Sequence, residues 1–428
     1  MNHPDWARAA TVYQINTRQF TPEGTLWAAA EQLPRLQRLG VTILWLMPVQ
    51  PIGEKNRKGE LGSPYSVQDY YGLNPEFGTH DDLRAFVDRA HELGLYVILD
   101  WVANHTAWDN VLVDEHPEWY ARDHKGDFRP TPWWDWSDII DLDYTHRELR
   151  DYMRDAMKWW VTDCGIDGYR CDVAGYVPVD FWEEVRAELD RIKPVFLLAE
   201  WEARDLHRAA FDATYAWSWH EHLHRICHGK ETVAALFVYY SWNERAWPRD
   251  ALRMTFTDNH DKNAWEGTMY ELLGDGLEAA IVLSFVGEGI PLIYNGQEAG
   301  LDQRLEFFRR DPIEWREHAL GELFAKLIQL KKDHTALHNA PHGATMIRVP
   351  NNHESDVLSF VRQDDHTKLL AYFNFSARTQ VVRFSDEQLY PGSYRDALTG
   401  HELELSEGEE VHVGPWGWRV LVAREARH

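Results

Sequence analysis

The first three quarters of the chain alternate short apolar runs with longer amphipathic segments. Eight runs are apolar nearly throughout, as expected for strands buried on both faces. They cover residues 11–20, 41–49, 95–102, 166–173, 195–201, 211–217, 252–261 and 290–298. Helical spacing follows at 146–162 and 180–193, and a capping box at 79–82 precedes a helix ending near Leu93. The alternation predicts a parallel sheet with helical crossovers.

Glycines support this interpretation. Four of them separate a helical segment from the next apolar run: Gly40, Gly94, Gly165 and Gly289. Glycine is favoured there because many helices end in a left-handed residue. Eight consecutive strand-helix units predict an α/β fold, a closed (β/α)8 TIM barrel, with its active residues at the carboxyl ends of the strands.

Two regions break the pattern. Residues 103–145 are rich in Trp, Asp, His and Pro, and so long a loop is usually functional. We expect a short excursion subdomain there, after strand three. Beyond about Leu337, short alternating segments predict a C-terminal antiparallel β-sandwich, at 345–349, 357–362, 369–374, 380–384 and 411–423. The expected domains are therefore a barrel (1–102 and 146–337), the excursion (103–145) and the sandwich (338–428).

The charge balance narrows the classes of binding partner that the protein is expected to have. Lys and Arg number 44 against 69 Asp and Glu, a net charge of −25. Nucleic acid and anionic membrane surfaces attract the opposite sign, so neither is expected as a partner. Ordinary solubility explains the acidity, and a salt-tolerant host is the alternative. The sequence does not predict the oligomeric state.

The number of cysteines and the first residues of the chain indicate the cellular compartment to expect. Three cysteines cannot form a disulfide framework. The first residues lack the basic and apolar regions of a signal peptide, and no run of 18 apolar residues exists. We therefore expect a cytoplasmic protein, or a secreted one if a leader has been removed.

Carboxylates follow several apolar strand runs directly. Asp100, Asp172, Glu200 and the pair His260-Asp261 come at the ends of the third, fourth, fifth and seventh runs. A single buried carboxylate is often part of a structural ion pair, but several at one barrel rim indicate catalysis or metal binding. Arg170 and Asp172 are two residues apart, so both side chains point into the barrel, while Cys171 packs toward the helices. Arg170 would hold Asp172 ionised, as a nucleophile must be.

These motifs resemble the α-amylase family, glycoside hydrolase family 13, over almost the whole chain. The stretch 100–105 is similar to the family's first signature, 168–172 to its second, Glu200 to its third, 259–261 to its fourth and 140–143 to its fifth; 63–65, 69–71 and 77–79 match a further segment. The resemblance implies that Asp172 is the nucleophile, Glu200 the general acid/base and Asp261 the third carboxylate. No cationic residue precedes Glu200 in its strand, so we expect neighbouring carboxylates to raise its pKa.

The resemblance also implies a subsite. Tyr65 resembles the family's stacking platform, and His105, Arg170 and His260 would bind sugar hydroxyls. Asp100 would support Arg170 and His105. Asn104 resembles a calcium ligand of many relatives, so a structural Ca²⁺ is a candidate cofactor, although the chemistry requires none.

The expected function is a retaining, double-displacement hydrolase that cleaves α-1,4 bonds of starch-type glucans or maltooligosaccharides. Gly62 stands where exo-acting relatives usually carry Asp, which favours an open cleft. Within the family, a transglycosylase and an α-glucosidase or cyclomaltodextrinase-type enzyme are the alternatives. A metal-dependent barrel enzyme and an inactive glucan-binding protein are alternatives of other classes.

Tryptophan is abundant, with 21 residues. Six crowd the third strand end and the excursion: Trp101, Trp108, Trp119, Trp133, Trp134 and Trp136. Aromatic faces stack on the apolar faces of sugar rings, but the same residues also serve to pack an excursion onto a barrel. Both interpretations stay open for each of the six.

Overall fold

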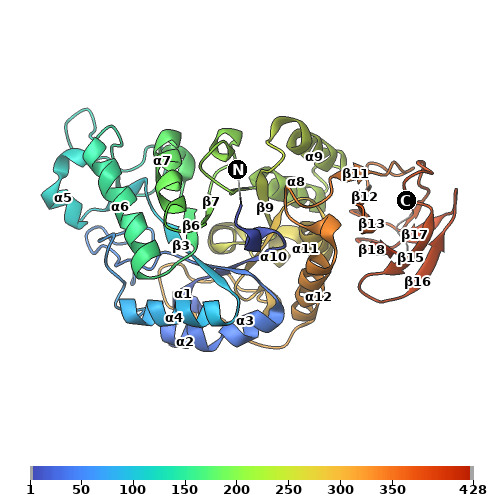
Figure 1. Ribbon diagram of the computed structural model, residues 1–428, viewed down its shortest axis with the longest axis horizontal. Coiled ribbons are helices and arrows are strands. Elements are labelled where there is room, and N and C mark those ends of the chain that lie inside the picture. Colours follow the sequence, from blue (N-terminus) through green and yellow to red (C-terminus); the bar gives the residue numbers. More distant parts are fainter. Residues whose placement is uncertain (1–2, 425–428) are drawn as a thin grey trace. The chain divides into compact units, whose positions relative to one another are not determined.

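The computed structural model describes residues 3–424. Its central feature is a closed parallel barrel with the strand order β1-β10-β9-β8-β7-β6-β3-β2. Figure 1 labels β3, β6, β7 and β9 of this barrel. The strands are β1 (Val12–Ile15), β2 (Ile43–Leu46), β3 (Tyr96–Trp101), β6 (Gly168–Cys171), β7 (Phe196–Ala199), β8 (Ala213–Tyr215), β9 (Leu252–Phe256) and β10 (Ile290–Tyr294). Each corresponds to one of the eight predicted apolar runs, so the predicted barrel is confirmed. Residues of these strands are buried on both faces, which is why their sequences are nearly continuously apolar.

Helices connect the barrel strands. They are α1 (Thr17–Phe20), α2 (Leu26–Glu31), α3 (Leu33–Leu39), α4 (His80–Glu92), α6 (Arg147–Asp163), α7 (Val179–Asp190), α8 (Trp217–Cys227), α9 (Ala234–Ala246), α10 (Met269–Leu273), α11 (Leu277–Val286) and α12 (Ala319–Asp333). The predicted capping box of α4 is present, because Thr79 and Asp82 exchange side-chain to backbone hydrogen bonds. Gly40 ends α3 in the left-handed region at φ 98°.

Strand ends differ from the predicted runs. The first run continues to residue 20, but β1 stops at Ile15 because the backbone turns at Asn16, whose carbonyl accepts the amides of Gln19 and Phe20. The seventh run continues to residue 261, but β9 stops at Phe256. There the Asp258 side chain accepts the Asn259 amide at 2.9 Å, a local bond that competes with strand pairing.

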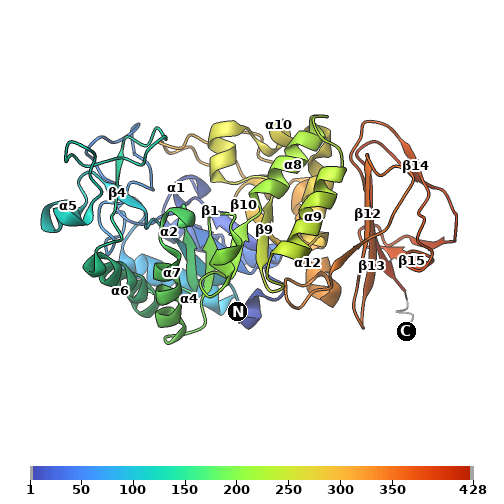
Figure 2. The same ribbon diagram turned by 90° about the horizontal axis from the view of Figure 1, so that it is seen from above.

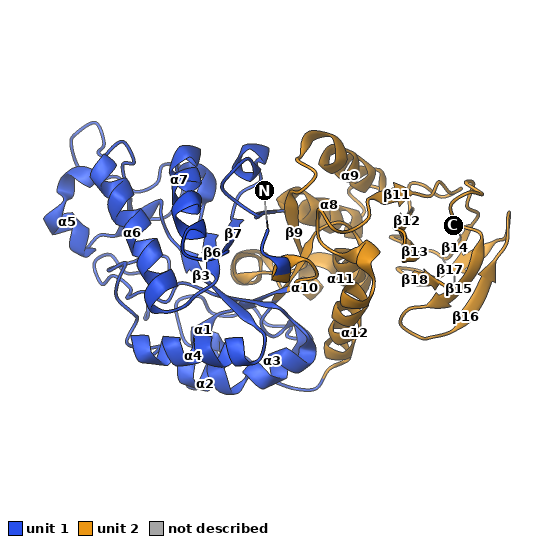
Figure 3. Cartoon of the chain, viewed as in Figure 1, with its two compact units in different colours: residues 1–5, 12–215, 294–317 blue, residues 6–11, 216–293, 318–428 orange. Residues whose placement is uncertain are grey.

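The predicted excursion contains little regular structure. Two short strands, β4 (His105–Ala107) and β5 (Ile139–Asp141), pair antiparallel, and α5 (Val111–Glu115) lies between them in sequence. The described residues form two compact units, residues 3–5, 12–215 and 294–317, and residues 6–11, 216–293 and 318–424 (Figure 3). The predicted domain boundaries stay a prediction.

The C-terminal strands form two antiparallel sheets, one in the order β11-β12-β13-β18-β15-β16 and one of β14 and β17. Figure 2 shows β12 and β13 running side by side. The strands are β11 (Met346–Arg348), β12 (Val357–Gln363), β13 (Lys368–Asn374), β14 (Gln380–Val382), β15 (Gly392–Asp396), β16 (Glu402–Leu405), β17 (Val411–Val413) and β18 (Trp418–Ala423). Side chains of both sheets, such as Val382, Val413 and Leu370, share one apolar core. The antiparallel architecture is confirmed, although β15 and β16 were not predicted and the run 411–423 is two strands.

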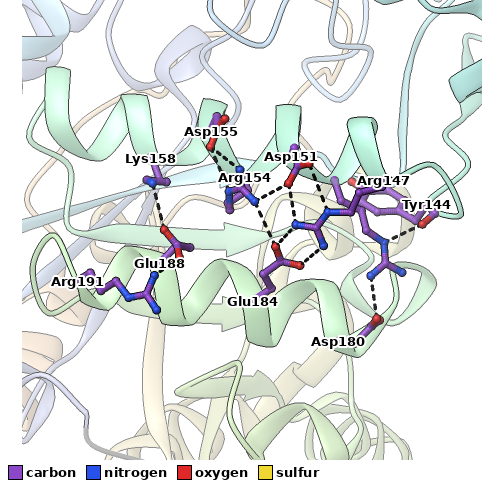
Figure 4. Close-up of polar contacts among 11 residues, drawn as sticks. Tyr144, Arg147, Asp151, Arg154, Asp155, Lys158, Asp180, Glu184, Glu188 and Arg191 are labelled. Atoms are coloured by element: carbon purple, nitrogen blue, oxygen red, sulfur yellow. Dashed lines mark hydrogen bonds and ion pairs between the residues drawn. The ribbon is translucent and has the colours of Figure 1, made fainter.

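Helices α6 and α7 lie side by side and are joined by a charged network (Figure 4). Glu184 of α7 accepts hydrogen bonds from both Arg147 and Arg154 of α6, and Asp151 pairs with the same two arginines. These groups are partly accessible to solvent, which screens their charges, so each pair contributes at most about 1 kcal/mol. The apolar faces of the two helices supply most of their stabilisation. No helix among residues 3–424 is long and apolar enough to cross a membrane.

Candidate active site

One buried guanidinium lies among three carboxylates at the ends of neighbouring barrel strands. Nη1 of Arg170 donates to Asp100 Oδ1 at 2.8 Å and to Asp172 Oδ1 at 2.9 Å. Nη2 of Arg170 lies 3.0 Å from Glu200 Oε2. Although burial alone lowers it, the carboxylates Asp100 and Glu200 raise the pKa of Arg170 well above its usual value. The arginine is therefore a permanent cation that holds the three acids together.

The strand register explains this cluster. Asp100 of β3 is paired with Arg170 of β6, and Asp172 follows two residues later on the same side. Cys171 is paired with Ala199 of β7, so Glu200 comes at the same level as Asp172. The Glu200 amide donates to the Cys171 carbonyl at 3.0 Å, which continues the ladder to the rim.

The contact between Arg170 and Glu200 corrects one sequence-based expectation. We expected Arg170 to serve Asp172, and for Glu200 we noted only that no cationic residue precedes it in its own strand. Instead the guanidinium contacts both, and the amide of Val173 also donates to Glu200 Oε2 at 2.8 Å. The expectation considered only neighbours within one strand, whereas Arg170 is long enough to reach the next strand. Charge at Arg170 therefore does not by itself distinguish the two carboxylates.

Asp100 is the most deeply buried of the three carboxylates. Complete burial raises its pKa to about 6, although the adjacent Arg170 lowers it. Its second oxygen accepts the Trp45 indole N–H at 3.1 Å and the Tyr65 hydroxyl at 3.0 Å. Asp100 thus orients Arg170 and Tyr65 together. That Asp100 also supports His105 stays a prediction.

Tyr65 is one of the aromatic residues that contact Arg170 and Asp100. Its ring stacks with that of Phe307 at a centroid distance of 6.3 Å and an interplanar angle of 13°. The Arg170 guanidinium carbon lies 5.6 Å from the Tyr65 ring centre. Phe307 was not predicted, because it lies in an irregular segment after β10 and no motif marks it.

His105 borders the nucleophile candidate. Its Nε2 lies 3.9 Å from Asp172 Oδ2. Burial lowers the pKa of His105 to about 4, so the ring is neutral near pH 7. A neutral imidazole can donate a hydrogen bond to a sugar hydroxyl without adding charge.

His260 and Asp261 follow the carboxyl end of β9, in the second compact unit. His260 Nε2 lies 3.5 Å from Asp261 Oδ2. The His260 side chain is buried, whereas the Asp261 side chain is 37% exposed. That Asp261 acts with Asp172 and Glu200 stays a prediction.

Asn104 does not have the surroundings that calcium prefers. Its Nδ2 donates to Asp141 Oδ1 at 3.3 Å, and the Thr131 hydroxyl donates to the same oxygen. The other Asp141 oxygen lies 3.8 Å from Arg129, and a guanidinium repels a metal cation. Calcium requires six to eight oxygen ligands, roughly. Within residues 3–424 no three His, Cys, Asp or Glu side chains gather to hold a metal. These residues do not fit a calcium ion.

Comparisons with known proteins identify the family of the chain. The family model of the α-amylase catalytic domain matches residues 9–340. The α-amylase MalA of Haloarcula japonica is 28% identical to this chain over 92% of its length. The match covers only 60% of the length of MalA, so this chain spans only part of that relative.

Two solved structures match nearly end to end. A noncanonic maltogenic α-amylase, AmyB of Thermotoga neapolitana, is 30% identical with a TM-score of 0.89, over 97% of this chain and 98% of that one. An α-amylase of Lactobacillus plantarum is 32% identical with a TM-score of 0.86, over 97% and 99% of the two chains. With its barrel, its strand-end carboxylates and the match over residues 9–340, the chain belongs to the α-amylase family of glycoside hydrolases.

Proposed function

We propose that the protein is a retaining hydrolase of α-1,4-glucosidic bonds in starch-type glucans or maltooligosaccharides. The observation that carries the proposal is the contact of Asp172 and Glu200 with neighbouring nitrogens of one buried guanidinium. Because both carboxyl groups contact the same guanidinium, they lie close to each other. Such closeness suits a double displacement, which needs the two carboxyl groups about 5–5.5 Å apart. The relatives' names support α-glucan substrates.

In the first step, an Asp172 oxygen attacks the anomeric carbon while Glu200 gives its proton to the leaving glycosidic oxygen. The glycosidic bond breaks and a glycosyl ester to Asp172 forms. In the second step, Glu200 takes a proton from water, the water oxygen attacks the same carbon, and the ester bond breaks. Two inversions give a product that retains the α configuration.

The remaining residues position the sugar. Tyr65 would stack against the reacting glucose, and neutral His105 would bind one of its hydroxyls beside Asp172. We assign Asp261 and His260 to the 2- and 3-hydroxyls, whose hydrogen bonds strengthen as positive charge develops on the ring. Arg170 and Asp100 would hold the side chains of Asp172 and Glu200 in position.

The direct test is the time course of products from maltoheptaose, starch, pullulan and cyclodextrin, with the first product's anomer read by proton NMR. We expect shorter maltooligosaccharides released as the α-anomer. Mainly longer oligosaccharides would favour the transglycosylase alternative. Preference for cyclodextrin over starch would favour the cyclomaltodextrinase-type alternative, and a first product in the β-anomer would exclude the mechanism.

The pH dependence of kcat/KM provides a prediction about Asp100 and His105. Asp100 has a raised pKa of about 6, so it becomes protonated below that pH and no longer pairs fully with Arg170. We therefore expect kcat/KM to fall as the pH decreases through about 6. The substitution His105→Gln should lower kcat/KM by about 100-fold but leave this acid limb in place, because His105 titrates near 4. A limb that moves by more than about half a pH unit in this variant would assign the titration to His105 instead.

Metal removal provides a second prediction. Because the surroundings of Asn104 do not fit calcium, incubation with EDTA followed by gel filtration should change neither kcat nor the melting temperature. Added calcium should shift the melting temperature by less than about 1 °C, since an ion that does not bind cannot stabilise. A rise in melting temperature that saturates with calcium concentration would restore the calcium assignment.

A further inference from the structure

A cleft separate from the active site lies within the second compact unit, which is orange in Figure 3. Its volume of about 570 Å³ is in the range of small-molecule sites. Its walls come from the end of α9 and the loop after it, the residues just before β10, the segment after α12, and β12. The cleft thus lies at the amino end of β9, whereas Asp261 follows the carboxyl end of that strand. We call it the basic cleft.

The basic cleft differs in charge from the chain as a whole, whose net charge is −25. The charged residues that line it are four arginines and two glutamates: Arg245, Arg249, Arg253, Arg362, Glu244 and Glu288. The arginines come from three separate segments, namely the region from the end of α9 to the loop after it, β9, and β12. Arginines gathered from separate segments of an acidic chain indicate a site for an anion.

Arg362 provides a buried positive charge in the wall of the cleft. It is only 2% exposed. Its guanidinium donates to backbone carbonyls, those of Ala344, Val286, Gly287 and His338. Burial lowers the pKa of Arg362 to about 10, although Glu288 raises it, so the group stays charged at neutral pH. A buried charge bound by neutral groups is costly, and an anion in the cleft would offset that cost.

A buried lysine beside this wall supports the same conclusion. The ammonium of Lys331, on α12, donates to the carbonyls of Leu337 at 2.7 Å and Gly289 at 3.3 Å, and Gly289 lines the cleft. Burial, and after it the charge of Arg362, lower the pKa of Lys331 well below its usual value. Where one cation disfavours the charge of the next, an added anion is favourable.

Arg253, on β9, is held in a fixed position in the same wall. Its Nη1 donates to Asn243 Oδ1 at 2.8 Å, and its guanidinium carbon lies 3.7 Å from the ring centre of Trp247. Asn243 and Trp247 both line the cleft. A guanidinium that is ordered in advance loses little conformational entropy when a ligand binds.

We propose that the basic cleft binds a phosphate group, either as free phosphate or as the ester of a small polar molecule. Phosphate has at least three acceptor oxygens, which can each face a different arginine, whereas a carboxylate has two oxygens in one plane. Because β9 and β12 both contribute arginines, a bound phosphate would connect the barrel strand to the C-terminal sheet. It would therefore also stabilise the folded protein.

Calorimetric titration at pH 8 and constant ionic strength tests the proposal. The ligands are inorganic phosphate and glycerol 3-phosphate, which has no glucose ring for the active site to bind. We expect saturable binding of at least one of them, with a dissociation constant of about 1 mM or lower. The melting temperature should rise over the same concentrations. The tighter ligand identifies the source of the phosphate group. Glycerol and succinate should bind at least about tenfold more weakly, because they lack the phosphate.

Variants of opposite sign assign the binding to the cleft. The double substitution Arg245→Gln with Arg249→Gln changes two exposed side chains, and it should raise the dissociation constant by about tenfold. Glu288→Gln should lower the dissociation constant by about threefold, because it removes a negative charge. Its amide oxygen can still accept the Met346 amide, which Glu288 binds at 2.7 Å.

The matched control is Arg378→Gln with Arg383→Gln, two exposed arginines that do not line the cleft. It should change the dissociation constant by less than about twofold. The inference would be overturned by a wild-type protein that binds neither phosphate compound, by equal binding of succinate, or by equal losses in the two double variants.

Discussion

The substitution Asp172→Asn should lower kcat on maltoheptaose by at least about 10⁴-fold, because an amide cannot form the glycosyl ester. Asparagine has the same shape, and its carbonyl oxygen can still accept the hydrogen bond that Asp172 takes from Arg170 at 2.9 Å. The cooperative unfolding transition should therefore be kept. Initial rates and a urea unfolding curve of the same preparation measure both effects.

The control for this variant is Asp180→Asn. Asp180 lies on α7, is 68% exposed and pairs with Arg150, so the same chemical change should leave kcat unaltered. If Asp172→Asn kept more than about one hundredth of the activity, the nucleophile assignment would be wrong.

The second large effect is expected at Arg170. Arg170→Met keeps much of the side-chain volume but leaves three carboxylates without their shared cation. Removal of one partner of a buried ion pair costs about 3–5 kcal/mol, so the free energy of unfolding should fall by that amount. Activity should fall by about 10³-fold because the acids lose their alignment. Urea unfolding and kcat/KM measure the two losses.

Arg170→Lys keeps the claim testable if the Met variant does not fold. A compact ammonium cannot bridge three carboxylates as a planar guanidinium does, so stability should be intermediate and activity should stay impaired. Arg147→Met on the exposed network is the matched control, with an expected change of at most about 1 kcal/mol. Equal effects at Arg147 and Arg170 would contradict the central place of the buried guanidinium.

The barrel was predictable from the sequence because its strands are buried on both faces and their apolar runs stand out. The ends of the runs were less predictable. Polar residues such as Asn16 and Asp258 bend the backbone while the composition around them stays strand-like. The strands β15 and β16 were not predicted, although residues 402–405 alternate Glu and Leu, as a strand with one exposed face does.

The site was predictable where it depends on one strand. Period-two alternation correctly placed Arg170 and Asp172 on one side of β6. Contacts across strands depend on register and side-chain length, so the pair of Arg170 and Glu200 was not foreseen. The stack of Phe307 on Tyr65 joins segments far apart in sequence, and no local pattern announces it.

The central claim is that Asp172 forms a covalent bond to the sugar while Glu200 moves the proton. The variant Glu200→Gln with α-maltosyl fluoride tests it most directly, because fluoride departs without an acid whereas hydrolysis of the ester lacks its base. Mass spectrometry of an acid-quenched digest should find a maltosyl group on the peptide that contains Asp172. A maltosyl group on another residue, or no adduct together with release of β-maltose, would contradict the account.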